Sequence, residues 1–252
     1  MDDTSWITET LDLVATGALR TIALAATSVI VSVACGVLLG VLLCLPNGRW
    51  STPARGILTA YLQVFRGLPV LVTLFIVFFV SPSLGVQLAS FPAAVVGLSL
   101  WGSANVMEVV RGAVRSIPTA QSEAASALGF GWTSVMRWVV LPQAIKRMLP
   151  PVVNLIVDLI QATTLASLIG VVEVLQRSRQ AVEYYQLSEG DGHATPIFAA
   201  VLLLFFLICY PLTLLAKRIE RRITTPGRPP SSSLPAAEPA PASTVHADPA
   251  NR

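Results

Sequence analysis

Five long apolar stretches decide what this chain can fold into, at residues 21–45, 57–80, 91–110, 149–172 and 196–216. A helix needs about 20 mostly apolar residues to cross the hydrocarbon core of a membrane. Backbone polar groups find no water there, so only helices and closed barrels can span it. Hydrophobic residues make up 54% of the chain and charged residues 12%, whereas about a quarter of a soluble domain is charged. The sequence therefore predicts an all-α polytopic membrane protein with a five-span domain at residues 19–223.

The second stretch is the least regular of the five. Arg66 interrupts it, and residues 68–80 alone are too short to cross. Its helix is therefore expected to begin before Arg66. Gly67, Pro69 and Pro82 are expected to bend or end this span, because proline lacks a backbone N–H and collides with the preceding turn.

Basic residues are distributed unevenly among the loops. Residues 1–18 contain no Lys or Arg. The loop after the third span and the segment after the fifth are rich in both, with Arg111, Arg115, Arg137, Lys146 and Arg147 in the first and Lys217, Arg218, Arg221 and Arg222 in the second. Because cytoplasmic loops collect Lys and Arg, residues 1–18 should be an extracytoplasmic segment and the C-terminus should be cytoplasmic. Only Arg177 and Arg179 oppose this orientation.

The Pro-, Ala- and Ser-rich residues 226–252 have no apolar periodicity and are predicted to be a disordered cytoplasmic tail. The three cysteines all lie in apolar stretches, which favours a packing role, and no spacing predicts a metal site.

The loop between the third and fourth spans is polar yet favours helix. Residues 118–128 are rich in Ala, Gln, Glu and Leu, and Gly129 is expected to end the helix. A second amphipathic segment at 132–140 is expected to end at Pro142. A partner that gripped this loop could move spans three and four as rigid bodies. The alternative is an ordinary amphipathic loop at the membrane surface.

This loop resembles the EAA loop of ATP-binding-cassette (ABC) importer permeases, which reads here as Glu123-Ala124-Ala125, Gly129, Val139 and Leu141-Pro142. Further segments resemble the polar amino-acid uptake permeases, in the order Phe65-Arg66-Gly67-Leu68-Pro69, Ser103-Ala104, Glu108, Arg111-Gly112, Gln143-Ala144 and Tyr210-Pro211. The resemblance covers roughly residues 15–223. The chain departs from the family pattern at Ala120, Asn105 and residues 161–164, and the last two put the substrate in doubt rather than the mechanism.

The resemblance implies a type I permease bundle with a cytoplasmic coupling helix, in the bacterial plasma (inner) membrane. The residues that match the coupling motif are Gln121, Glu123, Ala124, Ala125, Leu128, Gly129, Leu141 and Pro142. The implied partners are a second permease subunit, cytoplasmic ATP-binding subunits and an extracytoplasmic solute-binding protein. The chain has no glycine-rich phosphate loop followed by Lys-Ser or Lys-Thr. No cofactor is therefore expected in this non-catalytic subunit, with ATP and Mg²⁺ bound by the partner ATPase and no nucleic acid involved.

Polar residues inside the spans are candidates for a solute path. Asn154, Asp158 and Gln161 share one face of the fourth span, and Asn105 and Glu108 share one face of the third. Ionisable groups at membrane depth are costly unless they face partners or water. The alternative is that these residues join helices, or that Glu108 pairs with Arg111 at the cytoplasmic interface.

The function predicted from the sequence is a permease subunit of an ABC importer for polar amino acids or related small zwitterions. One alternative is a self-contained secondary transporter or channel with Asp158 as its ion or proton site. Another is a membrane scaffold whose loop recruits partners.

Overall fold

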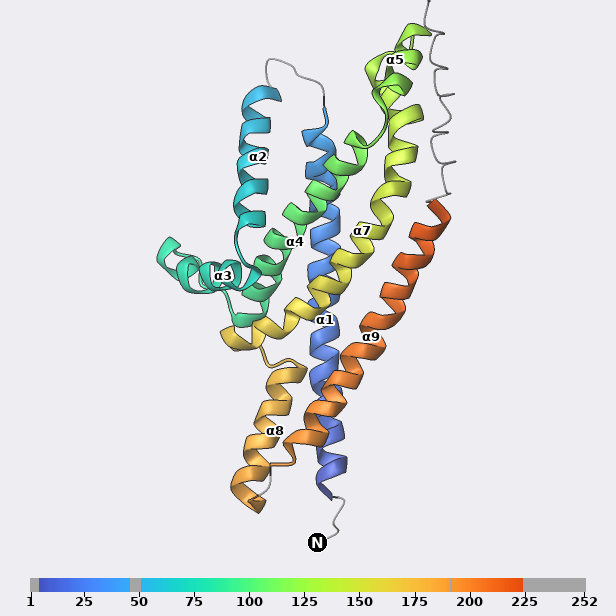
Figure 1. Ribbon diagram of the computed structural model, residues 1–252. Coiled ribbons are helices and arrows are strands. Elements are labelled where there is room, and N and C mark those ends of the chain that lie inside the picture. The colour runs from blue at the N-terminus through green and yellow to red at the C-terminus, as the bar shows by residue number, and fades with distance from the viewer. Residues whose placement is uncertain (1–4, 46–50, 191, 224–252) are drawn as a thin grey trace, which may run out of the picture.

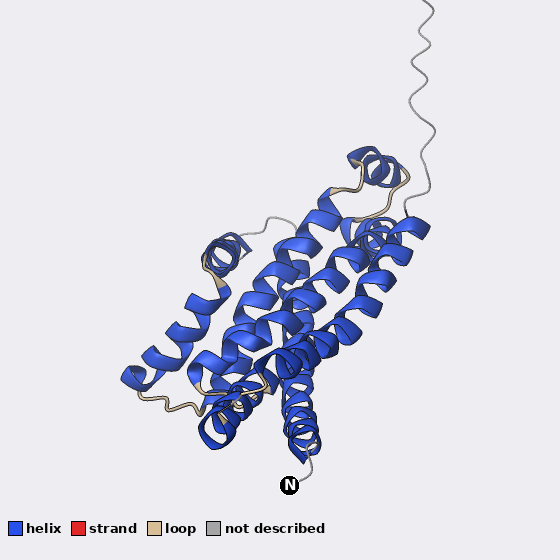
Figure 2. Ribbon diagram, turned by 60° about the horizontal axis from the view of Figure 1, so that its bottom comes forward, coloured by secondary structure: helices blue, strands red, loops and turns tan. Residues whose placement is uncertain are grey.

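The computed structural model describes residues 5–45, 51–190 and 192–223, and this part of the chain is helical with no strand (Figures 1 and 2). The predicted tail at 226–252 lies outside the described residues. The α-helices are α1 (Ser5–Leu43), α2 (Ser51–Gly67), α3 (Val70–Phe75), α4 (Ser90–Arg115), α5 (Thr119–Ala127), α6 (Trp132–Val135), α7 (Leu141–Ala162), α8 (Val174–Glu189) and α9 (Ala194–Ile223).

Four helical stretches are long and apolar enough to cross a membrane, at Thr10–Leu43, Ser90–Arg115, Trp132–Ile169 and Ala194–Ile223. A fifth crossing is reached only if Pro53–Gly67 and Val70–Leu84 count together, and these two helices are bent by 110°. The all-α polytopic fold is thus confirmed.

The second predicted span is a broken helix. In Figure 1, α3 lies across the lower end of α2. The break falls at Leu68 and Pro69, because proline restrains the residue before it and offers no N–H to the preceding turn. The bend expected from Gly67 and Pro69 is therefore confirmed.

Helices α1 and α4 pack closely at the centre of the bundle. A Cβ added at Gly36 would lie 2.5 Å from Val106 Cβ, and one at Gly40 would lie 2.7 Å from Val110 Cβ. A Cβ added at Gly102 of α4 would likewise lie too close to the Ser32 side chain of α1. In lipid, apolar side chains gain little from leaving the solvent, so close backbone approach at small residues is a main source of helix association.

Pro142 does not end the segment that begins at Trp132. The chain continues from α6 through a short π-helix (Met136–Val140) directly into α7. Pro142 lies in the first turn of α7, where its missing N–H costs little. The prediction that a helix ends at Pro142 was wrong, because proline is tolerated at a helix start as well as beyond a helix end.

The molecule has two distinct ends (Figure 1). Helix α5 and the C-terminal end of α9 lie at one end, and the start of α1 lies with α8 at the other. Gly17 joins α1 to α8, since a Cβ there would lie 2.8 Å from Val174 Cα. The basic segments at the ends of α4 and α9 are therefore on the same side of the bundle, opposite the basic-poor start of the chain.

Candidate functional site

Helix α5 forms the tip of the loop between α4 and α7. It ends in a Schellman motif: Phe130 N–H donates to Ala125 O at 3.2 Å, and Gly129 N–H donates to Ser126 O at 2.9 Å. Gly129 has a φ of +86°, a left-handed conformation that favours glycine. The helix end predicted at Gly129 is confirmed.

One side of helix α5 packs against the end of the bundle. Ala125 is buried with Ile117, Val135 and Val140 in a small apolar cluster. This cluster joins the end of α4, helix α5 and the segment leading into α7. A displacement of α5 must therefore displace the ends of its two neighbours, because packed side chains transmit movement as a unit.

Two hydrogen-bonded contacts strengthen this attachment. Gln143 Nε2 donates to Gln121 Oε1 at 2.6 Å and thus ties α7 to α5. Arg147 Nη1 donates to Ser116 O at 2.6 Å and ties α7 to the end of α4. Neither Gln143 nor Arg147 was among the predicted coupling residues. The family motif includes Gln143, but its partner across the loop appears only in three dimensions.

The outer side of this region exposes large apolar side chains. Leu128 is 79% exposed and Trp138 is 68% exposed, with Phe130 nearby in the sequence at 47%. Apolar residues gathered at a polar loop are a typical mark of a protein-interaction surface. We call the exposed residues of α5 together with Leu128 and Phe130 the loop tip.

The predicted coupling residues divide between the loop tip and its support. Gln121, Glu123, Ala124, Leu128 and Gly129 are exposed, whereas the Ala125 side chain is buried. Leu141 and Pro142 begin α7 below the tip. Their contact with an ATPase stays a prediction.

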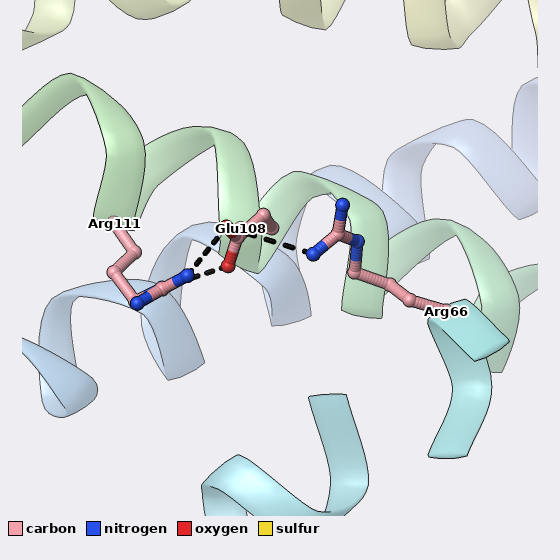
Figure 3. Close-up of polar contacts among 3 residues, drawn as sticks. All are labelled: Arg66, Glu108 and Arg111. Carbon is pink, nitrogen blue, oxygen red and sulfur yellow. Dashed lines mark hydrogen bonds and ion pairs between the residues drawn. The ribbon is translucent and has the colours of Figure 1, made fainter. Parts of the chain in front are cut away.

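Glu108 lies at the centre of an ion-pair group that joins α4 to α2 (Figure 3). Arg111 Nε donates to Glu108 Oε2 at 2.7 Å, and its Nη2 donates to Oε1. Arg66 Nη1, from the end of α2, lies 3.5 Å from Glu108 Oε1. The alternative that Glu108 pairs with Arg111 is confirmed, and Arg66 is a second partner that sequence reasoning missed.

The two predicted polar faces are not joined to each other. Asn105 Nδ2 donates to Trp101 O within α4, while Asn154, Asp158 and Gln161 lie on the exposed side of α7. Across the described residues, no hydrogen bond or ion pair links the Asn105–Glu108 face to the α7 face. Gln161 instead contacts the Cys209 thiol of α9. The role of the residues on these two faces in a solute path stays a prediction.

Residues 32–225 match the family described as binding-protein-dependent transport system inner membrane component. The arginine transport system permease protein ArtQ of Bacillus subtilis (strain 168) is 35% identical over 77% of this chain and 87% of ArtQ. The probable glutamine ABC transporter permease protein GlnP of the same organism is 33% identical over 67% of this chain and 76% of GlnP.

Among solved structures, the crystal structure of an amino acid ABC transporter with histidines has the same fold. Its TM-score is 0.75 at 24% sequence identity, covering 88% of this chain and 99% of that chain. The matched region contains the bent second span, the loop tip and the Glu108 group. The chain therefore belongs to the family of inner-membrane components of binding-protein-dependent transport systems.

Proposed function

We propose that this chain is the membrane-spanning subunit of an ABC importer for polar amino acids or related small zwitterionic solutes. The names of ArtQ and GlnP support this solute class, as does the ordered series of motifs from Phe65 to Tyr210. The observation that carries the proposal is the loop tip, which is exposed to a partner on one side and fastened to α4 and α7 on the other.

The loop tip acts as the lever. Cytoplasmic ATP-binding subunits, which hold the nucleotide and Mg²⁺, grip α5 of each permease subunit. When ATP binding closes these subunits, the two α5 helices approach each other, and the Ala125 cluster passes the movement to α4 and α7. The bundle then changes from inward-facing to outward-facing, which is alternating access driven by differential binding of nucleotide to two states.

The orientation follows from the charges at the two ends of the bundle. The loop tip and the end of α9 lie in the cytoplasm, where Lys and Arg collect. The start of α1 and helix α8 lie outside. An extracytoplasmic solute-binding protein delivers its solute at that end.

The polar face of α7 borders the path and meets a second permease subunit or the water between the subunits. The exposed Asn154, Asp158 and Gln161 support this placement, since a carboxylate facing hydrocarbon is costly. The carboxylate of Asp158 can hold an ammonium group, and the amides of Asn154 and Gln161 can bind other polar groups of a zwitterion.

The test uses the full transporter, with Glu123→Lys and Gly129→Asp in this chain. Both variants should lose ATPase subunits during purification and lose solute uptake, while the bundle keeps its melting temperature. The matched control for co-purification is Glu183→Lys, which reverses an exposed charge on α8 at the opposite end and should keep the ATPase subunits bound. Uptake and co-purification both at the unmodified level in the two α5 variants would contradict the proposal.

Family membership does not favour a self-contained secondary transporter with Asp158 as its ion site. The two mechanisms differ in energy source. Uptake by reconstituted transporter should stop when vanadate traps the ATPase subunits, and should not follow an imposed ion gradient. Uptake that survives vanadate and follows the gradient would favour the secondary transporter.

A further inference from the structure

We propose that a basic cavity between the C-terminal end of α1, helix α2 and the end of α4 binds a phosphate group of net negative charge, carried by an anionic lipid headgroup or free in solution. The cavity measures about 520 Å³, within the range of about 300–1,000 Å³ of small-molecule sites. Its polar lining includes Arg55, Thr59 and Gln63 of α2, Arg111 and Arg115 of α4, and Cys44. None of the lining residues is acidic.

The arginines keep positive charge for a ligand. Glu108 is the one carboxylate paired in this region of the described chain, and it is shared between Arg111 and Arg66. It takes hydrogen bonds from Nε and Nη2 of Arg111, which leaves the Nη1 group to donate elsewhere. Arg115 is exposed and has no ion pair with a described residue. The single carboxylate of Glu108 thus cannot balance the charges of Arg66, Arg111 and Arg115.

Arg55 is already oriented toward this cavity. Its Nη2 donates to Leu43 O at 2.9 Å, at the last residue of α1. This bond holds the guanidinium beside the end of α1. Arg111 and Arg115 are four residues apart on α4 and therefore lie on the same face. Guanidinium groups from two helices thus converge on one volume.

A phosphate group fits this arrangement better than a single carboxylate. Free phosphate offers more charged acceptor oxygens than a carboxylate, and a phosphodiester headgroup offers two that are held on a tetrahedral rather than a planar centre. Guanidinium groups bind both through paired, charge-assisted hydrogen bonds. The cavity also lies where α1 and α4 end, at the level expected for a membrane surface, where basic pockets between spans bind anionic headgroups. Leu43, Leu62 and Val114 add apolar wall, which suits the part of a lipid below its headgroup.

The experiment uses the full chain with Cys35→Ala and Cys209→Ala, so that Cys44 in the cavity is its only thiol. The chain is placed in nanodiscs of phosphatidylcholine alone, whose choline offsets the phosphate charge, or of phosphatidylcholine with the anionic phosphatidylglycerol. A third arm adds inorganic phosphate to phosphatidylcholine discs, against chloride at equal ionic strength. The rate of Cys44 modification by N-ethylmaleimide, a neutral reagent, is measured in each.

If phosphatidylglycerol slows the reaction and inorganic phosphate does not, the ligand is a lipid headgroup. If inorganic phosphate slows the reaction as well, the site is open to phosphate from solution. Arg115→Gln should weaken the protection about fivefold, since one cation near an anionic surface contributes about that factor. Lys146→Gln is the matched control, because it removes an exposed charge on α7 outside the cavity. Equal rates in all three arms, or equal responses of the two variants, would overturn the proposal. This readout needs neither ATPase nor solute, so it is independent of the proposed transport function.

Discussion

Glu173 is fully buried where α8 begins, and its carboxylate holds the first turn of that helix. It accepts hydrogen bonds from Leu175 N–H and Gln176 N–H, both at 2.9 Å. Thr21 of α1 accepts from Val174 N–H at 3.1 Å beside it. Two residues more than a hundred positions apart thus satisfy the N–H groups that a helix start leaves unpaired. Glu173 directly follows the fourth predicted span at 149–172, and nothing in the sequence pattern predicts Thr21 as its neighbour.

Glu173→Ala should lower the free energy of unfolding by about 1–2 kcal/mol, because removing an N-cap leaves backbone donors without acceptors. The matched control is Glu183→Ala, which removes an exposed carboxylate from the same helix. Thermal unfolding of the full chain in detergent micelles measures both variants. Equal melting temperatures for the two would contradict the capping role.

The same carboxylate should make stability depend on pH. Burial raises the pKa of Glu173 above its usual value near 4.5. The N–H groups of Leu175 and Gln176, the Thr21 hydroxyl and the charge of Arg179 act in the opposite direction but are outweighed. The folded chain therefore binds this proton more tightly than the unfolded chain, so the contribution grows as pH falls through the raised pKa and is lost as pH rises through it. Glu173→Gln cannot titrate there. Measured from pH 7 down to 4.5, the unmodified chain should gain stability relative to the glutamine variant.

At the scale of elements, the contact between α1 and α4 depends on glycine. Gly36→Ala places a Cβ 2.5 Å from Val106 Cβ and 2.7 Å from Ser103 O. The helices must separate, which should cost about 1–3 kcal/mol, as other overpacked substitutions do. Gly112→Ala is the matched control on α4, since no atom beyond its chain neighbours and the adjacent backbone of its own helix lies within 4 Å of the added Cβ. It should be neutral or stabilise by about 0.5–1 kcal/mol through helix propensity. Unfolding of the full chain in detergent should rank Gly36→Ala well below Gly112→Ala, and the reverse order would contradict the close contact.

Sequence periodicity and composition predicted the helices better than the contacts between them. The apolar stretches located the spans because a span must be long and apolar wherever it lies. Gly129 marked the end of α5 because a left-handed residue at a helix end favours glycine. The Arg66–Glu108 pair and the Gln121–Gln143 bond could not be found this way. Each joins residues of separate elements, and a single sequence carries no record of which elements meet.

At the scale of the whole molecule, the polar face of α7 indicates that one chain is an incomplete unit. Asn154 and Asp158 are exposed, as is Gln161 at the edge of this face, where it meets Cys209 of α9. The opposite side of α7 packs on the bundle through buried residues such as Leu159 and Ile160. A carboxylate inside a span is costly, with about 2.5–3.5 kcal/mol reached at the helix centre on insertion scales. A second permease subunit, or water enclosed between two subunits, would remove most of this cost. The side of α7 turned away from its own bundle is therefore where the proposed path belongs.

Asp158→Asn tests this placement in the assembled transporter. The substitution keeps the shape of the side chain and removes its charge, so binding of a solute ammonium should weaken about tenfold, the loss expected for one charge-assisted hydrogen bond. Solute-stimulated ATP hydrolysis should need correspondingly more solute, while basal hydrolysis stays unchanged. Glu220→Gln, an exposed carboxylate near the end of α9, is the matched control and should leave both unaffected. If the half-saturating solute concentration of Asp158→Asn equals that of the control, Asp158 lies outside the path.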